Sequence, residues 1–431
     1  MLILGDHSYT SSLLTADEMV RKYGLPKQFF RRTRDGGALW EPWARQAASD
    51  GNGLLRTRET DRDGRQIVIT PLAGGAGMAL VERYVGTDTP ASVGASVLPR
   101  FIDLPRDFIY AALMLQFSGT LTIAGGTTNG TPVDENPMEF IERIVVEGTG
   151  GGSALQIKNN RARMFYRAQH LLMGKEPNAV PITSGAIGGP TAWSFMCFLW
   201  FALPGAQVPP EISVQSVLDP SEYGKLTLEI DYGVTTDFIV AGDRTVTVPS
   251  AQSDVYALQP INVNLTKNRP YRYIETLFLQ DSVAALATER RLSNPIPVGR
   301  PIRYILEETR NEASPLKQPV DDTIGTTKIF ISQTLLGRWN TFRAIVDRNR
   351  TDNKVIDAIN PAGLDALSSR DNPAIGYYIW DFAKGGRLDG VLDASRFPSR
   401  GVPIDFLQDI LTASARQIYI SLGYLVPGGP R

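Results

Sequence analysis

The chain has 431 residues, of which 42% are hydrophobic and 21% are charged, and its formal net charge is −1 at pH 7. This length suits two core-forming domains with extensions, and the composition is typical of a globular protein rather than a disordered or fibrous one. The near-zero net charge excludes a global electrostatic attraction to nucleic acid or anionic lipid.

Residues 1–95 come first in chain order, and their pattern differs from that of the rest. Thr15 and Glu18 have the spacing of a capping box, which predicts a short helix that ends near Gly24. We expect no secretory signal here, because the first residues lack a basic start followed by an apolar stretch. The region is predicted to be an extended N-terminal arm that packs on neighbouring molecules rather than an independent domain.

This arm is locally basic. Residues 21–66 contain 11 Lys or Arg and 6 Asp or Glu, and the densest basic cluster is Arg31, Arg32 and Arg34. Such a cluster can bind the phosphates of a nucleic acid or the surface of a lipid membrane. It can equally be a solvated part of the arm that forms salt bridges with neighbours, and the sequence leaves both interpretations open.

From residue 96 to residue 250 the pattern changes to short apolar runs separated by turn residues, which predicts strands. One helix is predicted at Arg161–Met173, with Met164, Ala168 and Leu171-Leu172 on one side. The predicted strands are Phe108–Ile123, Ile141–Glu147, Ala154–Ile157, Trp193–Leu203 and Leu226–Asp231.

The only cysteine, Cys197, lies within one of these strands and excludes an intrachain disulfide and a thiolate metal cluster. Its apolar neighbours indicate a buried free thiol that packs as a small hydrophobic side chain. No apolar run in the chain reaches the length of about 18–20 residues that a membrane-spanning helix needs.

From residue 251 to residue 431 the same order returns. A helix is predicted at Leu336–Val346, and the segments 306–328 and 346–375 are interpreted as insertions that form surface loops. The predicted strands are Tyr273–Leu279, Ile302–Leu306, Ile329–Ile331, Tyr377–Phe382 and Ile418–Leu422.

Ordered matches between the two halves indicate an internal duplication. The matched segments are Leu115-Gln116 with Leu279-Gln280, Ile141–Ile144 with Ile302–Ile305, Tyr166–Ala168 with Phe342–Ala344, Trp200–Ala202 with Asp381–Ala383, and Leu226–Gly233 with Gln417–Gly423. A repeated unit of about eight strands with one helix fits a jelly roll, whereas an α/β fold needs a helix after nearly every strand. The predicted fold is therefore all-β, with two tandem eight-stranded jelly rolls at 96–250 and 251–431, each with a short helix, preceded by the extended arm.

The stretch Trp193–Gly233 combines a buried strand, a Pro-rich loop and an alternating strand, and Ile141–Glu147 is followed by a Gly-rich turn and a short strand. In pattern and order, residues 96–431 resemble the double-jelly-roll major capsid proteins of tailless icosahedral viruses, the lineage that includes adenovirus hexon and internal-membrane bacteriophages. The resemblance implies a structural protein that is not an enzyme and that forms pseudo-hexagonal homotrimers in the virion after synthesis in the host cytoplasm.

The resemblance also implies the partners of such a protein. They are neighbouring capsomers, minor capsid or vertex proteins and, through the arm, an internal membrane or the packaged genome. Two other functions remain open from the residues alone: a carbohydrate-binding or glycan-cleaving β-sandwich protein such as a viral spike, and a minor capsid or vertex protein.

Side chains able to act in catalysis or to ligate a metal are few, and we expect no catalytic, cofactor-binding or metal-binding residue. The two histidines, His7 and His170, are too few for a metal site on a jelly roll. Gly148–Gly152 lacks the Lys-Ser/Thr end of a phosphate-binding loop and is interpreted as a hairpin turn. The adjacent acids Glu307-Glu308 and Asp321-Asp322 are expected to point to opposite faces of their strands.

Overall fold

The computed structural model describes most of the chain after residue 78 and five short strands before it. These strands are β1 Leu14–Thr15, β2 Phe30–Arg32, β3 Leu39–Pro42, β4 Glu59–Thr60 and β5 Gln66–Ile67. The other described ranges are 79–91, 93–150, 153–173, 178–202, 216–240, 242–261, 271–297, 300–312, 317–331, 334–340, 375–382, 391–393, 404–413 and 416–427.

The arm is only sparsely covered by these ranges. Arg31 and Arg32 lie in β2, which pairs with β3, while Arg34 lies outside the described residues. Thr15, the predicted N-cap, lies in strand β1 instead, and the helix predicted after it also falls outside the described residues. The chain divides into two compact units, Met1–Glu82 with Pro260–Asn264, and Arg83–Gln259 with Leu265–Arg431.

The first jelly roll has eight principal strands in two sheets. Counted in chain order, the sheets have strand orders 2-7-4-5 (β7-β14-β10-β11) and 6-3-8-1 (β13-β8-β16-β6). The strands are β6 Ala79–Asp88, β7 Leu98–Asp103, β8 Ala112–Ala124, β10 Ile141–Gly150, β11 Ser153–Asn160, β13 Gly188–Trp200, β14 Lys225–Tyr232 and β16 Thr245–Ile261. Its minor elements are β9 Thr131–Pro132, η2 Met138–Phe140, α3 Ala162–Met173, β12 Ala179–Val180, η3 Pro220–Glu222, η4 Thr235–Asp237 and β15 Ile239–Val240.

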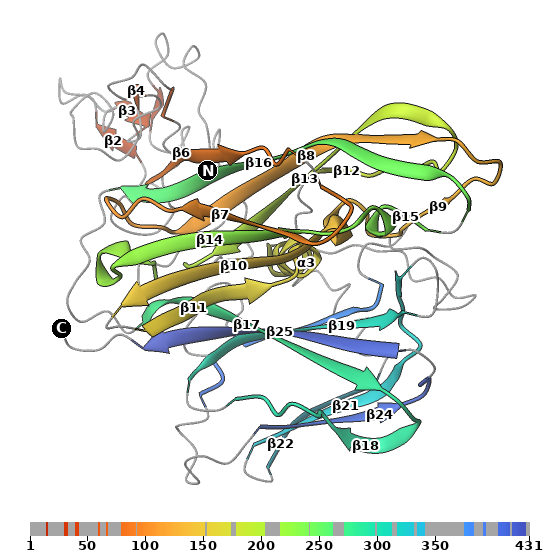
Figure 1. The fold of residues 1–431 in the computed structure, drawn as a ribbon. Helices are drawn as coiled ribbons and strands as arrows, with labels where there is room; N and C mark the ends of the chain where they lie inside the picture. The colour runs from red at the N-terminus through yellow and green to blue at the C-terminus, as the bar shows by residue number, and fades with distance from the viewer. Residues whose placement is uncertain are drawn as a thin grey trace. The chain divides into compact units, whose positions relative to one another are not determined.

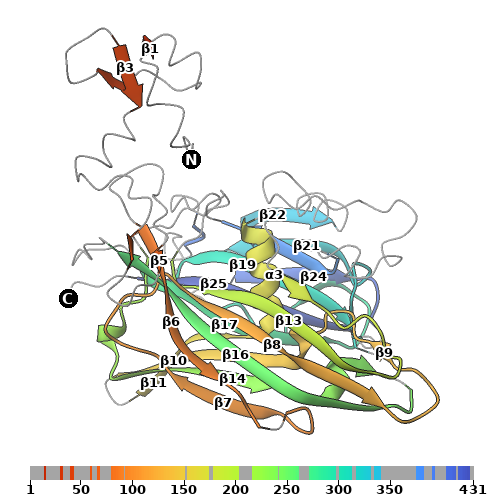
Figure 2. The ribbon, with the colours of Figure 1, turned by 90° about the horizontal axis from the view of Figure 1, so that it is seen from above.

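The second jelly roll repeats this topology. Its sheets have the same orders, 2-7-4-5 (β18-β24-β21-β22) and 1-8-3-6 (β17-β25-β19-β23). The strands are β17 Tyr271–Val283, β18 Ala287–Arg291, β19 Ile302–Asn311, β21 Ile324–Ile331, β22 Thr334–Asn340, β23 Tyr377–Asp381, β24 Ile404–Ile410 and β25 Arg416–Pro427, with β20 Gln318–Pro319 paired to β19. The prediction of two tandem eight-stranded jelly rolls is confirmed (Figures 1 and 2).

Binary patterning explains why these segments form sandwiches. In β14 the side chains of Leu226, Leu228 and Ile230 are buried and alternate with partly exposed polar ones, so one face of the strand covers the core. Trp193 fills the centre of the first core, and its indole occupies the space beside Gly119. A Cβ at position 119 would lie 2.6 Å from that ring, so only glycine fits there.

A parallel pairing joins the two jelly rolls into one sheet. Strand β11 of the first roll pairs with β17 of the second, in the register Lys158 to Thr276. The resulting sheet has nine strands in the order β20-β19-β25-β17-β11-β10-β14-β7, with β23 attached to β19. The two rolls are therefore connected by backbone hydrogen bonds between strands as well as by side-chain contacts.

Several details of the sequence-based prediction differ from the structure or lie outside the described residues. Residues 336–340 belong to strand β22 rather than to the start of a helix, and the remainder of that predicted helix lies outside the described residues. The predicted insertion at 306–328 contains the end of β19, all of β20 and the start of β21. The predicted insertion at 346–375 lies almost wholly outside the described residues. The boundary predicted at residue 96 falls between β6 and β7, and the one at 250 falls inside β16.

Candidate functional site: the junction between the jelly rolls

Helix α3 forms the centre of the junction. The helix follows β11 after one residue, Arg161, whose amide donates a hydrogen bond to the side-chain oxygen of Asn160 at 2.9 Å. The apolar face predicted from the sequence is confirmed: it is buried against aromatic and aliphatic side chains of the second roll. The members of this cluster are Met164, Ala168, Leu171 and Leu172 from α3, and Tyr304, Leu306, Tyr377 and Tyr419.

The side of α3 that adjoins this apolar face contributes two arginines to a buried ionic network. Arg163 donates from Nε to Glu308 Oε2 at 2.9 Å and from Nη1 to Glu139 Oε2 at 2.7 Å. Arg167 donates from Nη2 to Glu135 Oε1 at 3.2 Å. The network therefore connects α3 to the segment around η2 and to strand β19 of the second roll.

Strand β19 contributes a third arginine to the same network. Arg310 donates from Nη1 to Glu135 Oε2 and to Glu308 Oε1, both at 2.9 Å. Glu135 also accepts a hydrogen bond from the hydroxyl of Tyr377 at 2.8 Å. Since Glu135 lies in the first roll and Arg310 and Tyr377 in the second, these bonds cross the junction directly.

The network sets three arginines against three glutamates, Glu135, Glu139 and Glu308, and all six side chains are buried. Burial alone would raise the pKa of Glu139, but the guanidinium groups of Arg163 and Arg310 lower that pKa well below its ordinary value. The carboxylate of Glu139 is therefore ionised at neutral pH. A buried, hydrogen-bonded cluster of this kind is tolerated in a core only while every member is present.

Aromatic rings cover the arginines. The guanidinium of Arg163 lies 4.8 Å from the ring centroid of Tyr419, and that of Arg167 lies 5.5 Å from that of Tyr377. Cation–π contacts of this kind contribute favourably when the cation is desolvated. They also fix the ring positions that α3 packs against.

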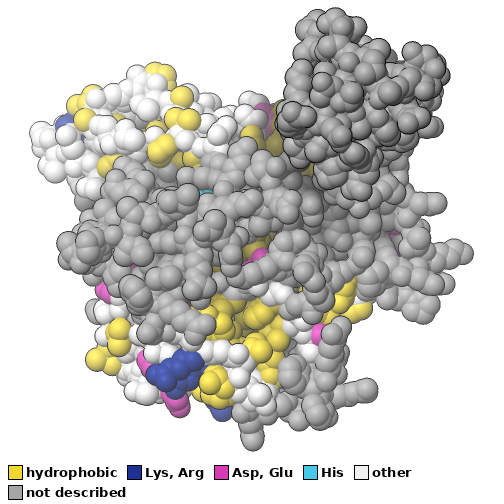
Figure 3. All heavy atoms as spheres, turned by 180° about the vertical axis from the view of Figure 1, so that it is seen from behind, with side chains coloured by type: hydrophobic (Ala, Val, Ile, Leu, Met, Phe, Trp, Pro, Cys, Tyr) yellow, Lys and Arg dark blue, Asp and Glu magenta, His cyan; other side chains and the backbone are white. Residues whose placement is uncertain are grey.

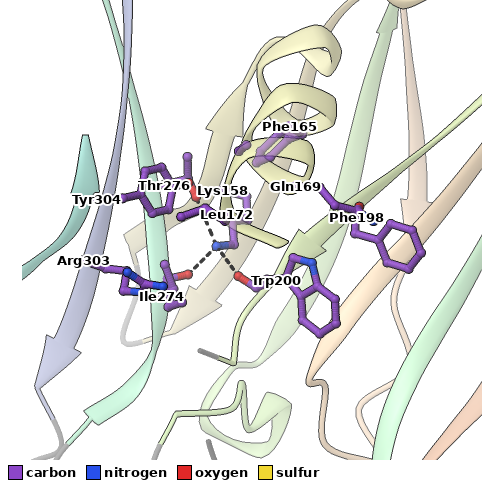
Figure 4. Close-up of a pocket in the computed structure, with 11 residues that line it drawn as sticks. Lys158, Phe165, Gln169, Leu172, Phe198, Trp200, Ile274, Thr276, Arg303 and Tyr304 are labelled. Carbon is purple, nitrogen blue, oxygen red and sulfur yellow. Dashed lines mark hydrogen bonds between the residues drawn. The ribbon is translucent and has the colours of Figure 1, made fainter. Parts of the chain in front are cut away.

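Lys158 forms a second polar contact of the junction, beside the strand pairing (Figure 4). Its ammonium donates to the carbonyl oxygens of Trp200 at 2.7 Å and Ile274 at 2.5 Å, and to Thr276 Oγ1 at 3.1 Å. Burial lowers the pKa of Lys158 from 10.5 to about 7. Three acceptors match the three protons of the ammonium form, so the hydrogen bonds favour the charged state that burial opposes.

The cavity around Lys158 is small. Its volume is about 20 Å³, and its walls come from α3, β11, β13, β17 and β19. This is room for about one water molecule, so the cavity does not accommodate an organic ligand.

The side chains singled out in the sequence lie in different places. Glu307 and Glu308 point to opposite faces as expected: Glu308 enters the junction, while Glu307 is buried beside Gln408 in the second roll. His170 is buried on α3, and burial lowers its pKa to about 3. Cys197 is a buried free thiol, and His7 lies outside the described residues.

Of the predicted hairpin turn, Gly148–Gly150 form the end of β10 and pair antiparallel with β11, while Gly151 and Gly152 lie outside the described residues. Asp321 accepts hydrogen bonds from the Gly376 amide and the Tyr378 hydroxyl, whereas Asp322 pairs with Arg416. In the part of the chain that the structure describes, no group of three or more His, Cys, Asp or Glu side chains is placed to hold a metal ion. No helix in that part is long and apolar enough to cross a bilayer.

The ionic network was not predicted from the sequence, although it left two signals. Arg163 and Arg167 are four residues apart, so they share one side of a helix, next to its apolar face. Glu308 and Arg310 follow the apolar run of β19 and face the same way, since they are two residues apart on a strand. The sequence does not indicate that these two pairs meet.

No family model matches the sequence, and no curated protein matches it. The fold, however, is shared with solved structures. The major capsid protein of STIV is 12% identical, with a TM-score of 0.55, and the match covers 81% of this chain and 97% of that one. A chain in the atomic structure of Sulfolobus turreted icosahedral virus is 13% identical, with a TM-score of 0.55 and coverage of 81% and 91%. The chain has the double-jelly-roll fold of these capsid proteins.

Proposed function

We propose that this double-jelly-roll chain is a structural major capsid protein, which forms pseudo-hexagonal homotrimers that tile an icosahedral virus shell. The observation that carries the proposal is the repeated topology: two jelly rolls with identical strand orders are joined through one shared sheet. Three such chains around a three-fold axis present six similar sandwiches, and repeated contacts between them can close into a shell.

The junction supports this function because a shell tile must keep a fixed angle between its two halves. A junction of apolar contacts alone can slide, since hydrophobic packing is not directional. Here the charge-assisted hydrogen bonds of Arg163 and Arg310 and the pairing of β11 with β17 set one orientation.

We further propose that the protein does not act as an enzyme and works through its shape and its contacts. The arginines and glutamates buried at the junction pair with one another, so they support positioning rather than turnover. Its location is then the virion, and its main partner is a second copy of the same chain. Minor capsid or vertex proteins are further partners in this proposal.

For the domain organisation, we propose an N-terminal arm followed by two jelly rolls; the arm, predicted to end at residue 95, ends before β6, which belongs to the first roll. The arm contacts neighbouring subunits in the shell. Its basic cluster, Arg31, Arg32 and Arg34, contacts the packaged genome or an internal membrane.

The test is the mass of the purified protein by light scattering, combined with negative-stain imaging. Stable trimers that pack into hexagonal arrays are the expected result. A monomer that is retained on carbohydrate columns would instead support a glycan-binding protein such as a spike and would overturn the proposal.

A further inference from the structure

The contact between the two rolls of one chain uses a defined pair of strands. Counted within each roll, it joins the fifth strand of the first roll, β11, to the first strand of the second roll, β17. The residues that meet there are buried, including Lys158 and Asn160 on β11 and Ile274 and Thr276 on β17. The duplicated fold contains a second pair of equivalent strands: β22, the fifth strand of the second roll, and β6, the first strand of the first roll.

Among the described residues, no strand pairs with the outer edge of either equivalent strand. Each is the last strand of its sheet within the described part of the chain, in the orders β18-β24-β21-β22 and β12-β13-β8-β16-β6. In the unit Arg83–Gln259 with Leu265–Arg431, these strands lie at opposite ends of the stacked sheets (Figure 1). An edge at each end is the arrangement that a head-to-tail contact requires.

Apolar side chains mark these two edges. Leu335 and Leu336 on β22 are 48% and 44% exposed, and Tyr84 on β6 is 45% exposed. Hydrophobic side chains are also visible over the lower part of the face in Figure 3, where Figure 1 places the second roll. An edge strand with exposed large apolar residues is prone to pair with another chain unless it is covered.

We propose that β22 of one copy docks beside β6 of the next copy, which repeats between chains the contact that β11 and β17 make within a chain. This inference rests on the proposed homotrimer and specifies its interface. Three copies then form a ring of six jelly rolls in which contacts within and between chains alternate. The occupant is a second copy because the same fold already supplies the complementary strand to the equivalent edge.

Disulfide trapping tests the contact. Tyr84→Cys is combined with Leu335→Cys in one protein and with Leu336→Cys in another, because neighbouring strand residues point to opposite faces. After mild oxidation, at least one of the two pairs is expected to give covalent dimers and trimers on a non-reducing gel, several-fold above each single variant. The matched control pairs Tyr84→Cys with Leu286→Cys, which is 66% exposed in a turn away from β22. The native Cys197 is buried and is kept.

Charge substitution provides the second measurement. Leu335→Glu with Leu336→Glu is expected to shift the mass from trimer to monomer while the thermal unfolding midpoint stays near that of the native chain. Leu411→Glu, at a side chain that is 60% exposed on another strand end, is expected to leave the trimer intact.

The outcomes separate this inference from the proposed function. If the native chain is a trimer but neither cysteine pair cross-links and the double glutamate variant stays trimeric, then the interface is wrong and the capsid proposal stands. If β22 cross-links to the N-terminal arm or to a co-purified minor protein instead, the choice of occupant is wrong. If the native chain remains monomeric and is absent from purified virus particles, both the interface and the capsid proposal are wrong.

Discussion

Replacing Arg163 with methionine removes the side chain that links α3 to both Glu139 and Glu308. Methionine keeps most of the volume, so the main change is that two buried carboxylates lose a partner at 2.7–2.9 Å. Breaking a buried ion pair by removing one partner costs about 3–5 kcal/mol. We therefore expect the free energy of unfolding to fall by roughly 4 kcal/mol, a large share of the ~5–15 kcal/mol that is typical of a folded domain.

The assay is urea denaturation followed by tryptophan fluorescence and by far-ultraviolet circular dichroism. Two probes are needed, because loss of the junction is expected to separate the unfolding of the two rolls into distinct transitions. Lys225→Met is the matched control: its ion pair with Asp103 at 2.9 Å is solvent-exposed, and such pairs contribute about 0–1 kcal/mol.

A double variant tests whether the loss of stability comes from the buried carboxylates that no longer pair with Arg163. Arg163→Met with Glu308→Gln removes one charge of each sign, so it is expected to recover part of the stability lost in the single variant. If Arg163→Met is no more destabilising than Lys225→Met, the ionic network does not hold the rolls together and the reasoning about the junction fails.

Three further predictions concern the second core, the first core and the arm. Burial raises the pKa of Glu307 from 4.5 to about 8; the hydrogen bond from Gln408 opposes this shift and the charge of Asp281 reinforces it. The stabilising contribution of Glu307 is therefore complete below pH 4.5 and is lost as the pH rises through 8. Glu307→Gln should flatten the pH dependence of the free energy of unfolding between these two values. Gly119→Ala should lower the free energy of unfolding by about 1–3 kcal/mol through overpacking, whereas Gly86→Ala, whose Cβ meets only Ile102 at 3.9 Å, should change thermal stability little. Deleting residues 1–60 should impair assembly seen by negative stain, and normal trimers and shells from that variant would contradict the arm's role.

The fold class could be predicted from the sequence because alternation is strong in strands such as β14, where Leu226, Leu228 and Ile230 face one core. The assignment of individual strands was less successful for the same reason: alternation makes all strands alike. The match of Trp200 with Asp381 joins the ends of the two sixth strands, β13 and β23, and is correct.

Three other matches join strands that are not equivalent. Leu115 and Leu279 lie on a third and a first strand, Ile141 and Ile302 on a fourth and a third, and Leu226 and Gln417 on a seventh and an eighth. The match of Tyr166–Ala168 with Phe342–Ala344 cannot be compared, because the second segment lies outside the described residues. Strand β18, Ala-Thr-Glu-Arg-Arg, was missed because it has almost no apolar residues.

The junction could be predicted only in part. The apolar face of α3 follows from the helical spacing of Met164, Ala168 and Leu171, which is local information. The meeting of Arg163 with Glu308 joins residues 145 positions apart, and it depends on the parallel pairing of β11 with β17. Which strands of two domains pair depends on how the domains pack, and the periodicity of a single strand carries no information on that packing.

The two kinds of contact in the proposed ring differ in a way that follows from when each forms. The contact between β11 and β17 forms as one chain folds, so it can bury charged groups permanently, and it is flanked by Lys158 and the arginine network. The contact proposed between β22 and β6 must remain open to water until another copy arrives. A charged group buried there would have to be desolvated at each assembly step, whereas Leu335 and Tyr84 are uncharged and release water favourably when they are covered.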